Sequence, residues 1–171
     1  MTMDHPALRY LLIVATAALL QYTLVAQFRI GGASADLLLV VAIAAGINSG
    51  TERGAIVGFA SGLCLDLMVA TPFGLGAIAG VVAGAVAGLL EGATVHSARW
   101  LTMVIALLSS AAGVLAFAVS GALLGRPDML SGHVFTIVGV VGVSSAIFVF
   151  PVVRACRWAD PEDRLLRAAV R

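Results

Sequence analysis

Charged residues are scarce in this sequence: only 11% of its 171 residues are Asp, Glu, Lys or Arg, and lysine is absent. Soluble domains carry about 25% charged residues, so this chain has too few to cover a surface that faces water. Hydrophobic residues make up 61% of the chain, and the mean hydropathy is +1.07. Segments that are apolar all round are typical of helices in a membrane. The composition therefore indicates an integral membrane protein without a sizeable soluble domain.

Residues that form catalytic or metal sites are equally sparse. The two cysteines, Cys64 and Cys156, do not have the spacing of a metal or redox motif. No glycine pattern matches a dinucleotide fingerprint, and no nucleophile lies beside a base. Basic residues interleaved with aromatic ones, as in nucleic-acid-binding surfaces, are also missing. We therefore expect no enzyme activity, no metal, no cofactor and no nucleic-acid partner. The three histidines are scattered over terminal and loop positions: His5, His96 and His133.

Charged and turn residues divide the chain into six apolar segments, roughly 9–28, 36–49, 54–70, 74–90, 100–124 and 133–153. A spanning helix needs about 20 apolar residues. The first, fifth and sixth segments reach that length, and the second to fourth are shorter. The first segment lacks a signal-peptide cleavage site, so we interpret it as a retained helix. The sequence predicts an all-α bundle of six short transmembrane helices at residues 1–156 and a basic cytoplasmic tail at 157–171.

The arginines are divided unequally between the two sides of such a bundle. Two of them, Arg29 and Arg126, lie on one side, and eight lie on the side of the termini. The positive-inside rule then places both termini in the cytoplasm of a cell-membrane protein. Merging the second and third segments would give five spans, and the unequal division argues against that. The eight are Arg9, Arg53, Arg99, Arg154, Arg157, Arg164, Arg167 and Arg171.

The tail has its own pattern, because Asp160-Pro161-Glu162-Asp163 is typical of a helix start. The arginines that follow lie on one face of such a helix. It could lie at the interface against anionic headgroups, or it could be a docking site for a cytoplasmic partner.

Glycines recur at every fourth residue in the third and fourth segments. Such rows let helix backbones approach closely in lipid, where van der Waals packing drives association. We expect the two rows to face each other or neighbouring helices of the bundle, and one face could alternatively meet a partner helix. The rows are Gly54, Gly58 and Gly62 in the third segment, and Gly76, Gly80, Gly84 and Gly88 in the fourth.

Asp66 continues the first glycine row. A carboxylate at the centre of a span costs about 2.5–3.5 kcal/mol, and its place on this row directs it into the protein. In the six-span arrangement Asp66, Asp36 and Arg29 lie near the outer side. We hypothesise a polar cluster there, in which Arg29 neutralises one or both carboxylates. The cluster could be a structural tie, a substrate or proton site, or a partner-binding surface.

The third segment carries a motif, Gly58-Phe59-x-x-Gly62-Leu63-x-x-Asp66-Leu67-x-x-x-x-Pro72-Phe73-Gly74-Leu75. It resembles the central signature of the MreD family of rod-shape-determining membrane proteins. Upstream, Asp36-Leu37-Leu38-Leu39 is similar to the opening of that family's second helix, although Ala35 stands where the family often has Pro. The resemblance spans most of the chain, and its specific motifs lie between Asp36 and Leu75. Its turn consists of Pro72, Phe73 and Gly74.

The resemblance implies a non-enzymatic component of the elongasome, the machinery that inserts peptidoglycan along the side wall. It implies MreC as the principal partner, a single-span protein with an extracytoplasmic domain. Further associates would be MreB, RodA and a class B penicillin-binding transpeptidase. The implied fold is similar to the six-helix substrate-binding subunits of energy-coupling-factor transporters.

That shared architecture leaves a second hypothesis open, a small-molecule-binding membrane subunit of a transporter. Such a subunit needs polar side chains that converge on a pocket, and the spans offer few: Gln21, Asp66, Thr102 and some serines. Interhelical hydrogen bonding explains Ser109, Ser110, Ser144 and Ser145 better than nucleophilic catalysis does. The sequence therefore favours the interaction protein.

Overall fold

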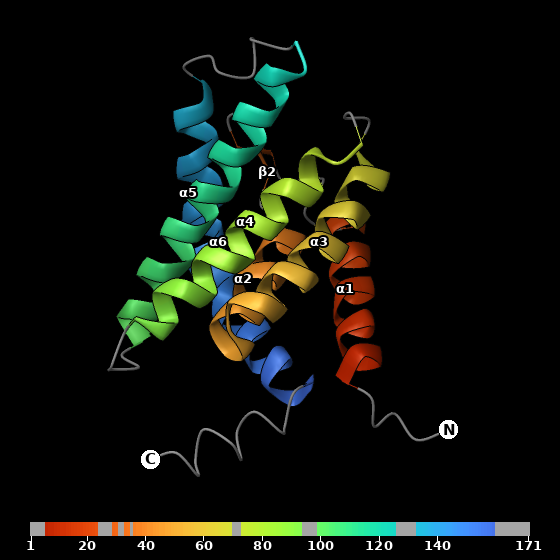
Figure 1. The fold of residues 1–171 in the computed structure, drawn as a ribbon, viewed down its shortest axis with the longest axis vertical. Helices are drawn as coiled ribbons and strands as arrows, with labels where there is room; N and C mark the ends of the chain where they lie inside the picture. The colour runs from red at the N-terminus through yellow and green to blue at the C-terminus, as the bar shows by residue number, and fades with distance from the viewer. Residues whose placement is uncertain are drawn as a thin grey trace.

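The computed structural model describes residues 6–23, 29–30, 33–34, 36–69, 73–93, 99–125 and 133–159. Within these ranges the chain forms six helices and one antiparallel pair of two-residue strands (Figure 1). The predicted all-α fold is therefore confirmed, with the strand pair as an addition. The elements are α1 (Pro6–Thr23), β1 (Arg29–Ile30), β2 (Ala33–Ser34), α2 (Leu37–Ser49), α3 (Thr51–Met68), α4 (Leu75–Gly92), α5 (Arg99–Leu123) and α6 (His133–Ala159).

Two helix ends depart from the predicted segments in a way that charge explains. Helix α3 begins at Thr51 rather than at residue 54, with Glu52 in its first turn, where a negative side chain is favourable. Helix α6 continues past residue 153 to Ala159, with Arg157 in its last turn, because positive side chains are favourable there. The predicted end of the first segment, residues 24–28, lies outside the described residues, as does the tail from residue 160.

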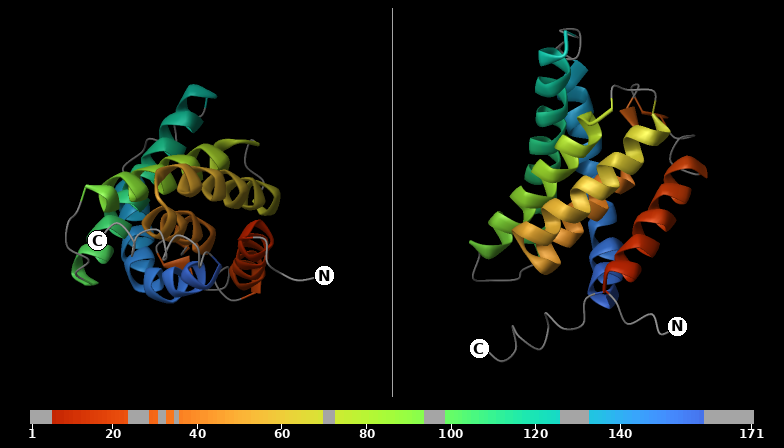
Figure 2. Two further views of the ribbon diagram at one scale, coloured as in Figure 1. Left: turned by 60° about the horizontal axis from the view of Figure 1, so that its bottom comes forward. Right: turned by 45° about the vertical axis from the view of Figure 1, so that its right-hand side comes forward.

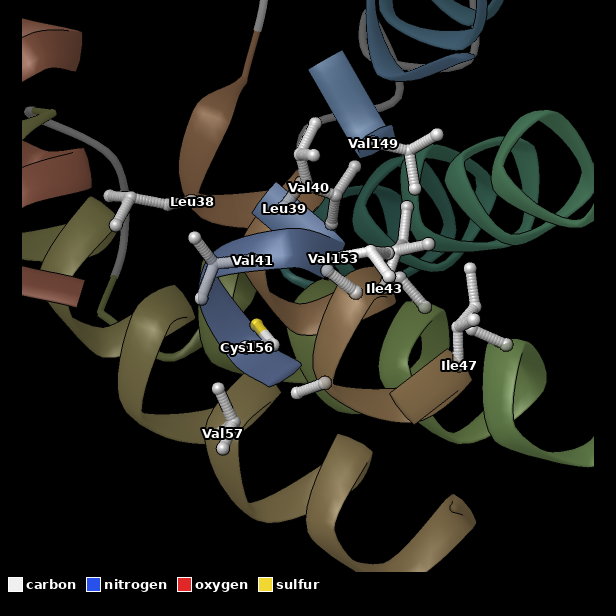
Figure 3. Close-up of a cluster of buried hydrophobic side chains, with 14 of the residues drawn as sticks. Leu38, Leu39, Val40, Val41, Ile43, Ile47, Val57, Val149, Val153 and Cys156 are labelled. Atoms are coloured by element: carbon white, nitrogen blue, oxygen red, sulfur yellow. The ribbon is translucent and has the colours of Figure 1, made fainter. Parts of the chain in front are cut away.

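Helix α2 is the centre of the fold, although it is the shortest of the six described helices. Its 13 residues span about 20 Å, and the run from Leu37 to Ile47 is buried on every side. It contacts all five other helices (Figure 2). Figure 3 shows that Val149, Val153 and Cys156 of α6 lie along it. The apolar residues all round α2 therefore meet protein rather than lipid.

A single residue separates α2 from α3. Gly50 has φ 87°, a left-handed conformation that favours glycine because it lacks a Cβ. Its N–H donates to the Gly46 carbonyl at 2.9 Å, and its own carbonyl accepts from the Gly54 N–H at 2.9 Å. Gly50 thus ends one helix and begins the next. The second and third predicted segments are two separate helices, as expected.

Three helices are long and apolar enough to cross a membrane: α4, α5 and the Thr136–Ala159 part of α6. They identify the chain as a membrane protein. The described parts of α1 and α2, Leu8–Thr23 and Leu37–Ser49, are apolar but shorter. Helix α3 is as long as α4 but carries Glu52, Arg53 and Asp66.

The beginning of α1 and the end of α6 meet at one end of the bundle (Figure 2). The Arg9 guanidinium lies over the Trp158 ring, 5.2 Å from its centroid, and Nη1 donates to the Trp158 carbonyl at 3.3 Å. Next to this contact, the Tyr10 hydroxyl is 2.9 Å from Oγ of Ser49. These polar contacts join the start of α1 to the ends of α2 and α6.

Candidate functional site

Asp66 joins the last turn of α3 to the first turn of α4. Oδ1 accepts the Gly76 N–H at 2.8 Å. Oδ2 accepts the Gly74 N–H at 2.9 Å and the Ala77 N–H at 3.3 Å. The first N–H groups of a helix have no intrahelical partner, and here a side chain from the preceding helix supplies one. The Asp66 residue is only 4% exposed. We call this arrangement the Asp66 clamp.

The two glycines around the clamp have separate physical reasons. Gly74 is the N-cap of α4, with φ 101°. It has no side chain to cap the helix itself, so Asp66 acts in its place. Gly76 makes room for the carboxyl group, since a Cβ there would lie 2.6 Å from Oδ1 of Asp66. A carboxyl group at a helix N-terminus is also favoured by the helix dipole.

Below the clamp, the two glycine rows face each other along α3 and α4. A Cβ added at Gly58 would overlap the Gly80 carbonyl oxygen, and a Cβ at Gly80 would overlap that of Gly58. Since a Cβ replaces an α-hydrogen, each glycine directs one Cα–H group at its partner's carbonyl, a weak attractive contact. The backbones themselves are in contact. The same reciprocal approach joins two further pairs, Gly62 with Gly76 and Gly54 with Gly84.

The row extends further back than the sequence analysis recognised. A Cβ at Gly46 of α2 would overlap the Gly84 carbonyl, and one at Gly88 would lie 2.6 Å from the Gly50 carbonyl carbon. Gly46 and Gly50 continue the four-residue spacing of the α3 row across the break between α2 and α3. That spacing was the signal that could have found them. Three helices, not two, therefore meet through glycine.

The second carboxyl group of the predicted polar cluster has a different partner. Asp36 is the N-cap of α2, and its Oδ1 accepts the Leu39 N–H at 3.0 Å. The neighbouring Leu37 N–H donates to Oε1 of Gln21 in α1 at 2.7 Å. Gln21, which the sequence analysis assigned to the few polar groups of the spans, thus helps to cap α2.

Arg29 lies in β1, opposite Ser34 of β2. Its side chain is outside the described residues, so the predicted pairing of Arg29 with the two carboxyl groups stays a prediction. Figure 1 shows β2 and the α3–α4 junction at the same end of the bundle, away from the first turn of α1. Both carboxyl groups already have backbone N–H partners there. Of the predicted motif turn, Phe73 and Gly74 are described, Phe73 is exposed, and Pro72 lies outside the described residues.

The serines of α5 and α6 do not form the interhelical hydrogen bonds that the sequence predicted. The Ser110 hydroxyl donates to the Leu107 carbonyl at 2.9 Å, and Ser144 donates to Val141 at 3.0 Å, each within its own helix. The hydroxyls of Ser109 and Ser145 are buried and have no hydrogen-bond partner among the described residues. A serine can satisfy itself on the preceding turn of its helix, which is why a polar residue in a span need not mark a contact.

Comparison with protein-family models, with curated proteins and with solved structures gives no match for this chain. Within the residues that the structure describes, no three His, Cys, Asp or Glu side chains form a group that could hold a metal ion. The site is thus defined by its own geometry: a carboxyl group and a ladder of glycines that fix α2, α3 and α4 against one another.

Proposed function

We propose that this protein is a non-enzymatic membrane component of the elongasome, which binds an MreC-like partner and helps to organise side-wall peptidoglycan synthesis. The observation that carries the proposal is the role of the motif residues. Gly58, Gly62, Asp66 and Gly74, on which the resemblance to the MreD family rests, all act at the α3–α4 contact. These residues shape a rigid surface of two helices, and a rigid surface suits a protein that binds other membrane proteins.

The polar side chains support an interaction protein over a transporter subunit. Asp66 and Gln21, the groups best placed to bind a small molecule, both accept backbone N–H groups within the bundle. Groups engaged in this way hold helices together and do not converge on a ligand.

We further propose that all six helices span the membrane, with both termini in the cytoplasm. The arginines whose side chains are described lie at the starts of α1, α3 and α5 and in the last turns of α6, which share one end of the bundle (Figure 1). Arg9, Arg53 and Arg99 are in the first group, and Arg154 and Arg157 in the second. The positive-inside rule assigns that end to the cytoplasm. The contact between Arg9 and Trp158 supports placing the first and last helix ends on the same side.

The test is co-purification of the full chain from its own cells in a mild detergent, followed by mass spectrometry. We expect a single-span protein with an extracytoplasmic domain, together with wall-synthesis enzymes. Recovery of transporter ATPases in place of these proteins would overturn the proposal.

Two carboxyl variants sharpen the test. Asp66→Asn disturbs the α3–α4 surface and should reduce recovery of the partner. Asp36→Asn is the matched control, because Asn caps a helix about as well as Asp does, and it should leave recovery unchanged. Equal recovery with both variants would show that the α3–α4 surface is not where the partner binds.

A further inference from the structure

Two arginines, Arg154 and Arg157, lie in the last turns of α6. Arg154 and Arg157 are both exposed. In the part of the chain that the structure describes, no carboxylate lies within ion-pair distance of either guanidinium. The opposite face of the same turns is buried, with Val153 and Cys156 packed in the core. Both arginines therefore lie on the outer face of α6.

The position of Arg154 along α6 indicates which groups can surround its side chain. It precedes the end of α6 at Ala159 by five residues, or about 7 Å along the helix axis. In the proposed six-span arrangement this position lies near the boundary between acyl chains and headgroups, since the 27 residues of α6 span about 40 Å and the hydrocarbon core about 30 Å. An arginine there extends its side chain toward the headgroups, because its charge is costly in hydrocarbon. Lipid phosphates lie at that level, and a guanidinium can bind them in a bidentate way.

The neighbouring aromatic ring completes the surface. Trp158 lies one turn beyond Arg154 on the same helix face and is 58% exposed. Its other neighbour is Arg9 of α1, whose guanidinium lies over the ring. Tryptophan is enriched at this level of membranes because its ring is apolar and its N–H is polar. The Trp158 ring thus lies between α1 and α6, in contact with the Arg9 guanidinium.

We infer that Arg154, Arg157 and Trp158 form a binding site for the phosphate group of an anionic phospholipid on the outer face of α6. Arg9 is a positioning residue, since it acts through the ring of Trp158. The inference concerns the lipid around the protein, and it holds whether or not the chain binds an MreC-like partner.

The experiment is native mass spectrometry of the full chain, released from nanodiscs that contain equal amounts of phosphatidylglycerol and phosphatidylcholine. We expect the unmodified protein to retain phosphatidylglycerol in preference to phosphatidylcholine. A basic residue near an anionic surface raises affinity about fivefold, so Arg154→Gln combined with Arg157→Gln should weaken retention about twenty-fivefold. Arg154→Lys combined with Arg157→Lys keeps both charges, so its retention of phosphatidylglycerol should fall by no more than about fivefold. This variant tests the inference if the glutamine variant does not fold.

Arg99 provides the matched control. It is exposed and lies next to Trp100, which is 66% exposed, at the start of α5, but the next turn of α5 has no second arginine. Arg99→Gln should lose no more than about fivefold, the contribution of a single charge near the surface, against about twenty-fivefold for the double variant. Three results would each overturn the inference: unchanged retention in the double glutamine variant, an equal loss in Arg99→Gln, or equal retention of the two lipids by the unmodified protein.

Discussion

Replacing Asp66 with asparagine tests the clamp with the smallest possible change in shape. The carboxyl group uses both oxygens, one for Gly76 and one for Gly74 and Ala77. An asparagine has one carbonyl oxygen, and its NH₂ group would face an N–H donor. If the oxygen keeps Gly74 and Ala77, one donor is lost, and if it keeps Gly76, two are lost.

The energetic cost follows from those losses. A buried donor without a partner costs about 1–3 kcal/mol, whereas hydrogen bonds between membrane helices average about 0.6 kcal/mol. Gly76 and Ala77 are buried, so the cost of a buried unpaired donor applies to their N–H groups. We expect the free energy of unfolding to fall by about 2 kcal/mol for Asp66→Asn.

The assay is reversible unfolding of the purified chain in mixed micelles with increasing sodium dodecyl sulfate, followed by circular dichroism. Asp36→Asn is the control, since an asparagine oxygen can keep the bond to the Leu39 N–H. This variant should change stability by less than about 0.5 kcal/mol. The reasoning is refuted if Asp66→Asn is as stable as the unmodified protein, or if Asp36→Asn is destabilised as much.

Three further outcomes are expected. Gly58→Ala should destabilise the bundle by about 2 kcal/mol or more in the same assay, since its Cβ would overlap the Gly80 backbone. Gly92→Ala should be neutral or stabilising by up to about 1 kcal/mol, since no neighbouring element of the described residues comes within 4 Å of the added Cβ. A similar loss in both variants would contradict the ladder. Gly50→Ala should cost about 1–3 kcal/mol from its backbone conformation alone, since φ 87° with ψ −179° lies in a region that is essentially limited to glycine. Beyond its chain neighbours, no atom of the described residues lies within 4 Å of the added Cβ, so no steric overlap adds to this cost. A variant as stable as the unmodified protein would show that the α2–α3 break adapts. Green fluorescent protein fused to either terminus should fluoresce, and alkaline phosphatase fused to either terminus should stay inactive. A green fluorescent protein fusion that does not fluoresce at one terminus would exclude six spans.

The positions of the helices could be predicted because the residues that separate them are chemically distinct. Gly50, the polar residues around it and the arginines at the helix starts all mark boundaries that follow from turn chemistry and charge. Two boundaries that differ from the prediction, at Thr51 and Ala159, lie where a charged residue borders the predicted segment. A charge of the correct sign extends a helix end rather than terminating it.

The role of α2 could not be predicted in the same way. Its sequence, from Leu37 to Ser49, is apolar on every side, and such a helix meets lipid and protein equally well because lipid tails are as apolar as leucine. Periodicity distinguishes a polar face from an apolar one, but here there is no polar face to locate. The shortest predicted span is the most buried helix because five neighbours surround it.

The partners of Asp66 were hidden from the sequence for a related reason. Sequence patterns indicate only charged side chains as partners of the Asp66 carboxylate, and Arg29 is the basic residue predicted to lie near it. The groups that bind the Asp66 carboxyl group are backbone N–H groups of α4. Every residue but proline has such a group, so the residue types in the sequence do not reveal which ones will bind. The local signal was Gly74, a glycine at a helix start that has no side chain to cap it. An acid eight residues before an uncapped helix start, on a row of glycines that brings the two helices into backbone contact, can reach that start. This explains why the acid and the glycines occur together in one motif: the ladder sets the distance between α3 and α4, and the carboxyl group fixes their relative position at the end where the ladder stops.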